Sequence, residues 1–253
     1  MTSRWLPPAQ LPARGPDPTN VHQRGELLRL LARRFASEPT GYIVGAVEIM
    51  GARFKVDRRG FIPRLDLTVL IEAGLDGVPA SATGRALDLA CGIGAAGICV
   101  ARARPGLALD LADVSAEAIE LARENAAQLG VAHAEAFSGD LFEALPPGRK
   151  GSYNVITANP PWVPDGTLLP SEVIDHEPVV SFFGGPDGLD LVRKIIADLP
   201  LWLAPGGVYA QECDPSQVER VLALLAEAGL SRGRAYADRE GVQRVVSAHL
   251  DAA

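Results

Sequence analysis

Few cysteines and no long apolar run narrow the classes of protein to which this chain can belong. The 253 residues include three cysteines, Cys91, Cys99 and Cys213, whose odd number and spacing predict neither a disulfide framework nor a zinc site. Scarce cysteines suit a reducing compartment. No apolar run reaches the ~18 residues of a membrane span, and the N-terminus lacks the apolar segment of a secretory signal. We therefore expect a cytoplasmic protein that binds no metal and no membrane.

The chain also lacks the excess of positive charge that is typical of nucleic-acid-binding proteins. Its formal net charge is −7, which opposes general affinity for phosphate backbones. Hydrophobic residues make up 47% and charged residues 22% of the chain, as in ordinary soluble proteins. The length suits one α/β domain with a small appendage. We expect no nucleic-acid partner, and the oligomeric state stays open.

The most informative segment is the tetrapeptide Asn159-Pro160-Pro161-Trp162. It follows an apolar run, residues 153–158, that reads as a buried parallel strand. Two prolines cannot continue the strand, so the chain must leave the sheet at Asn159. The side-chain oxygen of Asn159 and the backbone oxygen of Pro160 can both accept from one planar NH2 group, while the indole covers its face. The segment favours chemistry on a nitrogen, and a purely structural turn is the alternative.

A glycine-rich turn between a strand and a helix is the second feature. An apolar strand ends near Asp88 and Leu89, and Gly92 and Gly94 then make a tight turn into a helix over residues 95–103. Glycine lets the backbone approach a ligand closely. Dinucleotide-binding enzymes use such a turn too, so the turn alone predicts a nucleotide-like ligand without identifying it.

Acidic residues follow the next two predicted strands. Asp113 ends an apolar run over residues 107–112, a position where an acid typically holds ribose hydroxyls. Asp140 follows a third run, residues 131–137, and can accept from an adenine amine, or it can simply cap a short helix. Because open α/β sheets bind ligands at the carboxyl ends of their strands, these loops together predict one binding site.

The residues before the main domain predict a small appendage. Residues 1–19 contain five prolines and predict a Pro-rich arm. Asn20 and Gln23 resemble a capping box for a helix that ends near Ser37. We expect the apolar face of this helix to pack against the protein's own core. That face is formed by Leu27, Leu28, Leu31 and Phe35.

A hairpin and a helix complete the expected N-terminal region over residues 20–75. Residues 46–50 and 53–56 predict two strands around a turn at Gly51, and residues 66–73 begin a helix. The remaining residues, 76–253, form the expected main domain.

Strands and helices alternate along the main domain, which predicts a mostly parallel sheet with right-handed crossovers. The clearest helix spans residues 116–128, between Ser115 as N-cap and Gly130. Further helices are predicted over residues 191–203 and 218–228, with a strand at residues 208–212. Two last strands, residues 231–238 and 243–249, predict an antiparallel hairpin.

These features resemble those of class I S-adenosylmethionine-dependent methyltransferases, and more narrowly the HemK-type protein-glutamine N5-methyltransferases. The resemblance covers about residues 38–249. The matching stretches are Glu38-Pro39, Tyr42-Ile43-Val44-Gly45, Phe61-Ile62-Pro63-Arg64, Asp88-Leu89, Asp113-Val114-Ser115, Ala122-Arg123-Glu124-Asn125-Ala126, Gly139-Asp140-Leu141-Phe142, Asn159-Pro160-Pro161-Trp162, His176-Glu177-Pro178, Gly184-Gly185, Asp187-Gly188-Leu189-Asp190, Pro205-Gly206-Gly207, Glu212 and Arg244-Val245-Val246.

The resemblance implies a Rossmann-like α/β fold, with a seven-stranded, mostly parallel sheet, an antiparallel C-terminal hairpin and a small N-terminal helical and hairpin appendage. It implies S-adenosyl-L-methionine as cofactor. The residues expected to bind it are Asp88, Ala90, Gly92, Gly94, Asp113, Val114, Asp140, Leu141 and Asn159.

For catalysis, the resemblance implies that Asn159 and Pro160 hold the two N–H groups of the acceptor and that Trp162 stacks on its planar group. The acceptor is either a protein glutamine or a small molecule. The residues expected to contact it are Pro161, Trp162, Glu177, Pro178, Gly184, Gly185 and Arg64.

Several positions depart from the family pattern. The family carries glycine at the position of Ala90, small hydroxyl residues at Cys91 and Ile93, and tyrosine at Trp162. It has a Thr-Glu pair where this chain has Leu67-Thr68. It also carries a helical recognition domain at its N-terminus, where this chain has a short segment before Glu38.

Three functions stay open from the sequence. The first is methylation of a protein glutamine, as the motifs indicate. The second is N-methylation of a small amide, amine or guanidino compound enclosed by the arm, the hairpin and the Trp162 loop. The short N-terminal region, Trp162 and the absence of the Thr-Glu pair favour this alternative. A guanidinium would need a carboxylate to take its proton, and Glu177, Asp187 and Glu212 are the candidates. The third is a non-catalytic S-adenosylmethionine-binding protein.

Overall fold

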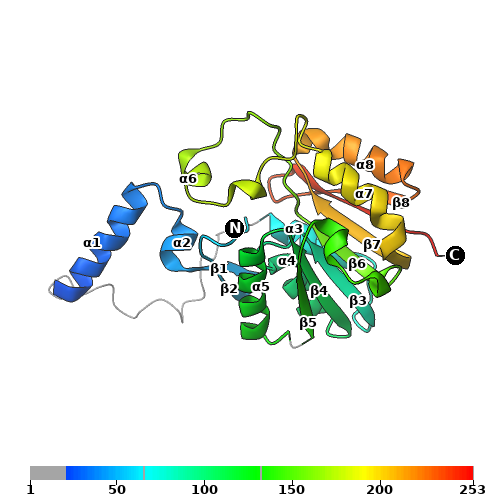
Figure 1. Ribbon diagram of the computed structural model, residues 1–253, viewed down its shortest axis with the longest axis horizontal. Helices are drawn as coiled ribbons and strands as arrows, with labels where there is room; N and C mark the ends of the chain where they lie inside the picture. Colours follow the sequence, from blue (N-terminus) through cyan, green and yellow to red (C-terminus); the bar gives the residue numbers. More distant parts are fainter. Residues whose placement is uncertain (1–20, 65, 132, 253) are drawn as a thin grey trace.

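The computed structural model describes residues 21–64, 66–131 and 133–252 (Figure 1). The arm expected at residues 1–19 and the capping residue Asn20 lie outside the described residues. Within the described ranges, no helix is long and apolar enough to cross a membrane. Cys91, Cys99 and Cys213 are buried free thiols.

The main domain is built on a seven-stranded sheet with the order β5-β4-β3-β6-β7-β9-β8. Strands β3 to β7 run parallel, and β9 is antiparallel to both β7 and β8. The predicted fold is therefore confirmed. The strands are β3 (Gly84–Leu89), β4 (Leu107–Asp113), β5 (Ala134–Ser138), β6 (Tyr153–Ala158), β7 (Leu203–Glu212), β8 (Ser231–Ala237) and β9 (Gln243–His249).

The order of the strands reverses between β3 and β6. From β3 the chain adds β4 and β5 on one side, and it then returns to place β6 on the other side. Open α/β sheets bind ligands at such a switch point, outside the carboxyl ends of the strands. The loops that end β3 and β6 carry the glycine turn and the Asn-Pro-Pro-Trp segment, so the topology places both at this point.

Helices cover both faces of the sheet (Figure 1). On one face, α3, α4 and α5 enclose a core that includes Leu70, Ile98 and Leu109. On the other face, α7 and α8 enclose a second core that includes Ile156, Leu199 and Tyr209. The helices are α3 (Leu67–Leu75), α4 (Ala95–Ala103), α5 (Ala116–Gln128), α6 (Ser171–Ile174), α7 (Asp190–Trp202) and α8 (Val218–Glu227), and the 3-10 turns are η1 (Leu141–Ala144), η2 (Pro147–Arg149), η3 (Val179–Ser181) and η4 (Pro215–Gln217).

Helix α5 has the bounds that its sequence predicts. The Ser115 hydroxyl accepts a hydrogen bond from the backbone N–H of Ala118 at 3.2 Å, which satisfies one of the free donors of the first turn. On its buried side, Asn125 accepts from the backbone N–H of Lys55 at 2.8 Å and donates to the carbonyls of Lys55 and Ile93 at 3.1 Å. One amide thus ties α5 to the hairpin and to the glycine turn.

The N-terminal region consists of α1 (Val21–Phe35), α2 (Thr40–Val44) and the hairpin of β1 (Ala46–Ile49) and β2 (Ala52–Lys55). The predicted hairpin is confirmed. Helix α3, which sequence analysis assigned to this region, packs on the main sheet beside α4.

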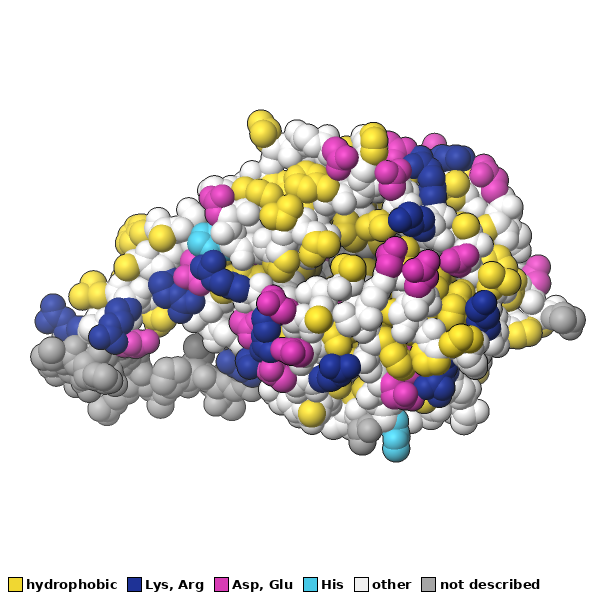
Figure 2. Space-filling view, in the orientation of Figure 1, with side chains coloured by type: hydrophobic (Ala, Val, Ile, Leu, Met, Phe, Trp, Pro, Cys, Tyr) yellow, Lys and Arg dark blue, Asp and Glu magenta, His cyan; other side chains and the backbone are white. Residues whose placement is uncertain are grey.

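The expectation that α1 buries its apolar face is wrong. Leu28 is 64% exposed and Phe35 is 87% exposed, and Leu27 and Leu31 are also exposed. Helix α1 projects from the body of the protein in Figure 1, and Figure 2 shows apolar and basic side chains together on it. Polar contacts hold it instead, because Arg33 pairs with Glu38 at 2.8 Å and Arg34 pairs with Glu172 at 2.9 Å.

Two strand boundaries also differ from the sequence prediction. The strand expected from residue 131 begins at Ala134, after a turn in which the Ala134 N–H donates to the Val131 carbonyl. The strand predicted at residues 208–212 begins earlier, because the segment Pro205-Gly206-Gly207 lies inside β7 (Leu203–Glu212). Helix α7 ends earlier, at Trp202, beyond an internal Pro200.

Gly97 fixes how closely α4 approaches the sheet, and its replacement tests that contact. A Cβ atom at this position would lie 2.6 Å from the Asp88 Cβ and 2.9 Å from the Leu109 Cδ1. We expect Gly97→Ala to lower the free energy of unfolding by roughly 1–3 kcal/mol, because the overpacked core must shift. Gly148→Ala is the matched control, since nothing lies within 4 Å of its added Cβ. Denaturant titration of both variants is the measurement, and an equal effect at the two positions would contradict the packing argument.

Candidate active site

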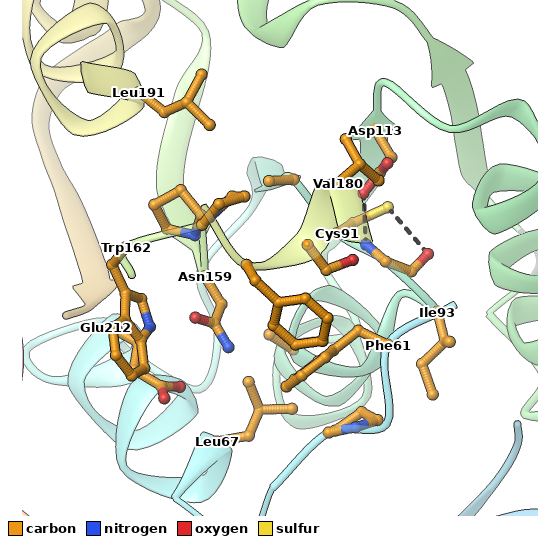
Figure 3. Close-up of a pocket in the computed structure, with 18 of the residues that line it drawn as sticks. Phe61, Leu67, Cys91, Ile93, Asp113, Asn159, Trp162, Val180, Leu191 and Glu212 are labelled. Atoms are coloured by element: carbon orange, nitrogen blue, oxygen red, sulfur yellow. Dashed lines mark hydrogen bonds between the residues drawn. The ribbon is translucent and has the colours of Figure 1, made fainter. Parts of the chain in front are cut away.

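A cavity of about 500 Å³ opens at the carboxyl ends of β3, β4, β6 and β7. Its size is that of a site for a small molecule or cofactor. Figure 3 shows Asp113 and Cys91 on one side of the cavity and Trp162 and Glu212 on the other. A segment with Phe61 and a loop with Val180 also line it.

Most of the residues that the sequence singled out line this one cavity. They are Arg64, Asp88, Ala90, Gly92, Asp113, Val114, Asp140, Leu141, Asn159, Pro160, Pro161 and Trp162. Apolar residues that sequence analysis did not single out for the site, Phe61, Leu169, Val173, Val180 and Leu191, complete its wall.

Five predicted site residues, Gly94, Glu177, Pro178, Gly184 and Gly185, are not part of the cavity lining. Gly94 is the N-cap of α4 with a φ of 80°, and its missing side chain faces Ile98 and Ala122 in the core.

Gly184 lies behind the Asn-Pro-Pro-Trp loop rather than in the cavity. A Cβ atom there would lie 2.5 Å from the carbonyl oxygen of Pro161. This contact supports the back of the loop, so the structure gives Gly184 a supporting place beneath the site.

The buried carboxylate of Asp88 supports the glycine turn. One oxygen accepts from the Gly97 N–H at 2.8 Å and the other accepts from the Thr157 hydroxyl at 2.9 Å. Burial raises the pKa of Asp88 to about 7, although both hydrogen bonds oppose the shift. This one side chain connects β3, the first turn of α4 and β6.

The turn at residues 90–94 requires left-handed backbone. Ala90 has a φ of 53° and Gly92 a φ of 52°, which explains why a glycine at the position of Ala90 would also fit. The Gly92 N–H donates to the Asp113 carboxylate at 2.8 Å, and the Ser115 N–H donates to its other oxygen at 2.9 Å. Burial raises the pKa of Asp113. The turn therefore places two backbone segments around one carboxylate at the cavity wall.

Backbone contacts hold the Asn-Pro-Pro-Trp loop from behind. The Gln217 side-chain amide donates to the Trp162 carbonyl at 3.0 Å and to the Asp187 carbonyl at 3.1 Å. The Val163 N–H donates to the Phe182 carbonyl at 2.9 Å. Within the described ranges, the Asn159 side chain has no hydrogen-bond partner, and Figure 3 shows it directed into the cavity. The protein therefore holds the loop through its backbone, and the Asn159 side chain lines the cavity.

Gln217 was not among the site residues predicted from the sequence. The signal was present, because Asp214 and Gln217 form a capping box at η4. The residue reads as a simple helix start, and only the fold shows that its amide reaches the loop.

Glu177 fixes the segment that carries Phe61 and Arg64. Its fully buried carboxylate accepts from the Ile62 N–H at 2.9 Å and pairs with the Arg64 guanidinium. Arg64 in turn lies 4.9 Å over the Phe61 ring, and the Phe61 and Phe182 rings meet edge to face at 5.9 Å. Glu177 therefore shapes the wall of the cavity from behind.

The three carboxylates that the sequence left open as proton acceptors differ in their surroundings. Glu177 pairs with Arg64, and Asp187 pairs with Arg193. Glu212 lines the cavity and is 7% exposed. Burial raises the pKa of Glu212 to about 7, with a further contribution from the charge of Asp66.

The chain matches known proteins over most of its length. Residues 70–173 match the methyltransferase small domain family. The release factor glutamine methyltransferase of Geobacter sulfurreducens is 34% identical, over 92% of this chain and 81% of that protein. The release factor glutamine methyltransferase of Cereibacter sphaeroides is 36% identical, over 98% and 87%. The ribosomal protein uL3 glutamine methyltransferase of Bordetella pertussis is 38% identical, over 75% and 64%.

Solved structures show the same fold at low identity. A methyltransferase from Pyrococcus furiosus superposes with a TM-score of 0.58 and 15% identity, over 92% of this chain and 99% of that chain. A Thermus thermophilus 16S rRNA methyltransferase solved with S-adenosylmethionine and guanosine gives a TM-score of 0.57 and 18% identity, over 81% and 49%.

The buried Glu177 contact can be tested by its effect on stability. We expect Glu177→Ala to lower the free energy of unfolding by roughly 1–3 kcal/mol, because it leaves the buried Ile62 N–H without its partner. Glu172→Ala is the matched control, because that carboxylate is 41% exposed and its pairing with Arg34 should contribute at most about 1 kcal/mol. Denaturant unfolding compares the two, and a loss for Glu172→Ala as large as that for Glu177→Ala would refute the anchoring role.

Proposed function

The chain belongs to the family of S-adenosylmethionine-dependent protein glutamine methyltransferases, and we propose that its acceptor is a glutamine side chain of a release factor. The observation that carries the proposal is the extent of the match. Release factor enzymes cover 92% and 98% of this chain and are themselves matched over 81% and 87% of their lengths. The uL3 enzyme of Bordetella pertussis is matched over 64% of its length, so uL3 is the second candidate.

A small acceptor is less well supported. Two premises of that alternative were a short N-terminal region and an α1 helix whose apolar face is used internally; the others were Trp162 and Leu67-Thr68 in place of the family's Thr-Glu pair. The first premise weakens because the release factor enzymes are matched over most of their own lengths. The second fails because Leu28 and Phe35 are exposed on α1.

The cavity fits S-adenosylmethionine, whose sulfonium supplies a reactive methyl group when it is bound. We assign the turn around Ala90 and Gly92, with Asp113 and Val114, to its ribose and amino acid portions. We assign Asp140 and Leu141 to its adenine portion. The support is that these residues line one cavity at the switch point of the sheet. Asp88 and Gly94 act from beneath, through the turn.

At the other end of the cavity, we assign Asn159 and Pro160 to the acceptor amide. The nitrogen of an amide is a weak nucleophile because its lone pair is delocalised into the carbonyl. With both of its N–H groups held by two fixed oxygens, the nitrogen can pyramidalise and direct its lone pair at the methyl carbon. Trp162 provides a planar surface against the amide. Such positioning of the reactants can contribute ~7–11 kcal/mol.

The acceptor can be identified with labelled methyl groups. The purified chain is incubated with methyl-labelled S-adenosylmethionine and, separately, with a release factor, ribosomal protein uL3 and a pool of free metabolites. We expect label in the release factor, on a glutamine side chain identified by peptide mass spectrometry. A release factor in which that glutamine is replaced by alanine is the control. Label in uL3 or in the metabolites, with none in the release factor, would reject the proposed acceptor.

Asn159 should matter for turnover more than for binding of the donor. We expect Asn159→Ala to lower kcat by on the order of 10²-fold, the scale of losing one preorganised polar group, because one of the two acceptors for the amide is lost. S-adenosylmethionine affinity, measured by calorimetry, should change little. Asn154→Ala is a control outside the cavity, where the amide accepts from the Arg85 N–H. Wild-type turnover in Asn159→Ala would contradict the assignment.

A further inference from the structure

The Glu212 carboxylate is buried and has no hydrogen-bond or ion-pair partner among the described residues. It ends β7 and lines the cavity. No side chain or backbone group in the described part of the chain forms a hydrogen bond with its carboxylate oxygens. No side-chain polar atom among the described residues is both buried and unpartnered, so these oxygens must reach the cavity. A charged group is costly to bury without a partner, which suggests a functional use.

The sheet places Glu212 beside the acceptor loop. Ala158 of β6 pairs in parallel register with Gln211 of β7. The next residues, Asn159 and Glu212, therefore start from equivalent positions on adjacent strands, which lie ~4.8 Å apart. Figure 3 shows the side chains of Asn159, Trp162 and Glu212 on the same side of the cavity.

We propose that the Glu212 carboxylate accepts the proton that leaves the acceptor nitrogen, on the assumption that the proposed glutamine N-methylation is correct. As the nitrogen lone pair forms the new N–C bond, the methyl C–S bond breaks and its electron pair stays on sulfur. The nitrogen then carries a positive charge and two hydrogens. One of these passes to Glu212 as a proton, which leaves a neutral N-methyl amide and a neutral carboxylic acid.

The charges around Glu212 suit this exchange. Asp66, at the start of α3, opposes a second negative charge, whereas Arg244 of β9 and Arg64 favour it. Asn159 and Trp162 on the neighbouring loop are neutral. Arg244 forms an ion pair with Asp238 at 2.6 Å, and Arg64 forms one with Glu177. Neither arginine is therefore paired with Glu212. The pKa of Glu212 is about 7, so the group can hold or release a proton near neutral pH.

This proposal sets the direction of the pH dependence. The carboxylate form is active, and its fraction falls as pH drops through about 7. Wild-type kcat/KM, which reports the groups of the free enzyme, should therefore rise between pH 6 and pH 8 and then level off. One pH unit below the pKa, it should be roughly tenfold below the plateau.

The test compares Glu212→Gln with Glu219→Gln, because Glu219 is exposed on α8 and is not part of the cavity lining. With the release factor as acceptor, Glu212→Gln should lose kcat by on the order of 10²-fold at pH 8, the lower range of general base catalysis. Its profile should also lose the rise between pH 6 and pH 8. Glu219→Gln should keep both the rate and the rise. Glu212→Asp should restore part of the rate, and S-adenosylmethionine affinity should stay within about twofold in all variants.

A second readout does not depend on turnover. Carboxyl carbon NMR is recorded on wild-type protein that is labelled only in glutamate. The label removes the aspartate signals, including that of Asp88, whose pKa is also raised. One glutamate should titrate near 7, and its signal should be missing in Glu212→Gln. A wild-type protein in which no glutamate titrates near 7, or a Glu212→Gln variant with the wild-type profile, overturns the proposal. A wild-type enzyme that labels no glutamine rejects the proposed function itself, and the NMR titration still decides the protonation of Glu212.

Discussion

The site depends on the contact between one buried acid and a helix that approaches it without a side chain. Asp88 is 2% exposed and accepts from the Gly97 N–H and the Thr157 hydroxyl. A Cβ at Gly97 would lie 2.6 Å from the Cβ of Asp88, so the close approach requires glycine. Because Asp88 ends β3 and Thr157 lies in β6, the contact fastens the two strands between which the strand order reverses. Both ends of the cavity are positioned from this point.

The side of the cavity that carries the Asn-Pro-Pro-Trp loop is assembled from segments that are distant in the sequence. Gln217 and Gly184 support the Asn-Pro-Pro-Trp loop, while Glu177 fixes Arg64 and the backbone at Ile62. None of these supports is local, and each acts on backbone or on a side chain that itself lines the cavity. A cavity built in this way keeps its shape through long-range contacts, whereas the residues proposed to bind the donor and the acceptor come from short motifs.

This difference between short motifs and long-range contacts explains which features the sequence could predict. Helix α5 was predicted to the residue, because Ser115 and Gly130 are local signals for its two ends. The glycine turn and the Asn-Pro-Pro-Trp loop were likewise predicted from local signals in the sequence. The exposure of the apolar face of α1 could not be predicted in this way. An amphipathic pattern predicts that a helix has an apolar side and does not say what covers that side. The position of Glu177 behind the wall was also missed, since its partners Ile62 and Arg64 are far away in the chain.

The same difference between short motifs and long-range contacts explains how Trp162 can stand where the family carries tyrosine. The contacts that hold this part of the loop involve backbone atoms, namely the Trp162 carbonyl with Gln217 and the Val163 amide with Phe182. The aromatic side chain takes no part in them. A tyrosine and a tryptophan can therefore alternate here while the oxygens of Asn159 and Pro160 keep their positions. In the proposed function, the exchange alters the surface that faces the acceptor and leaves unchanged the geometry proposed to hold the acceptor's nitrogen.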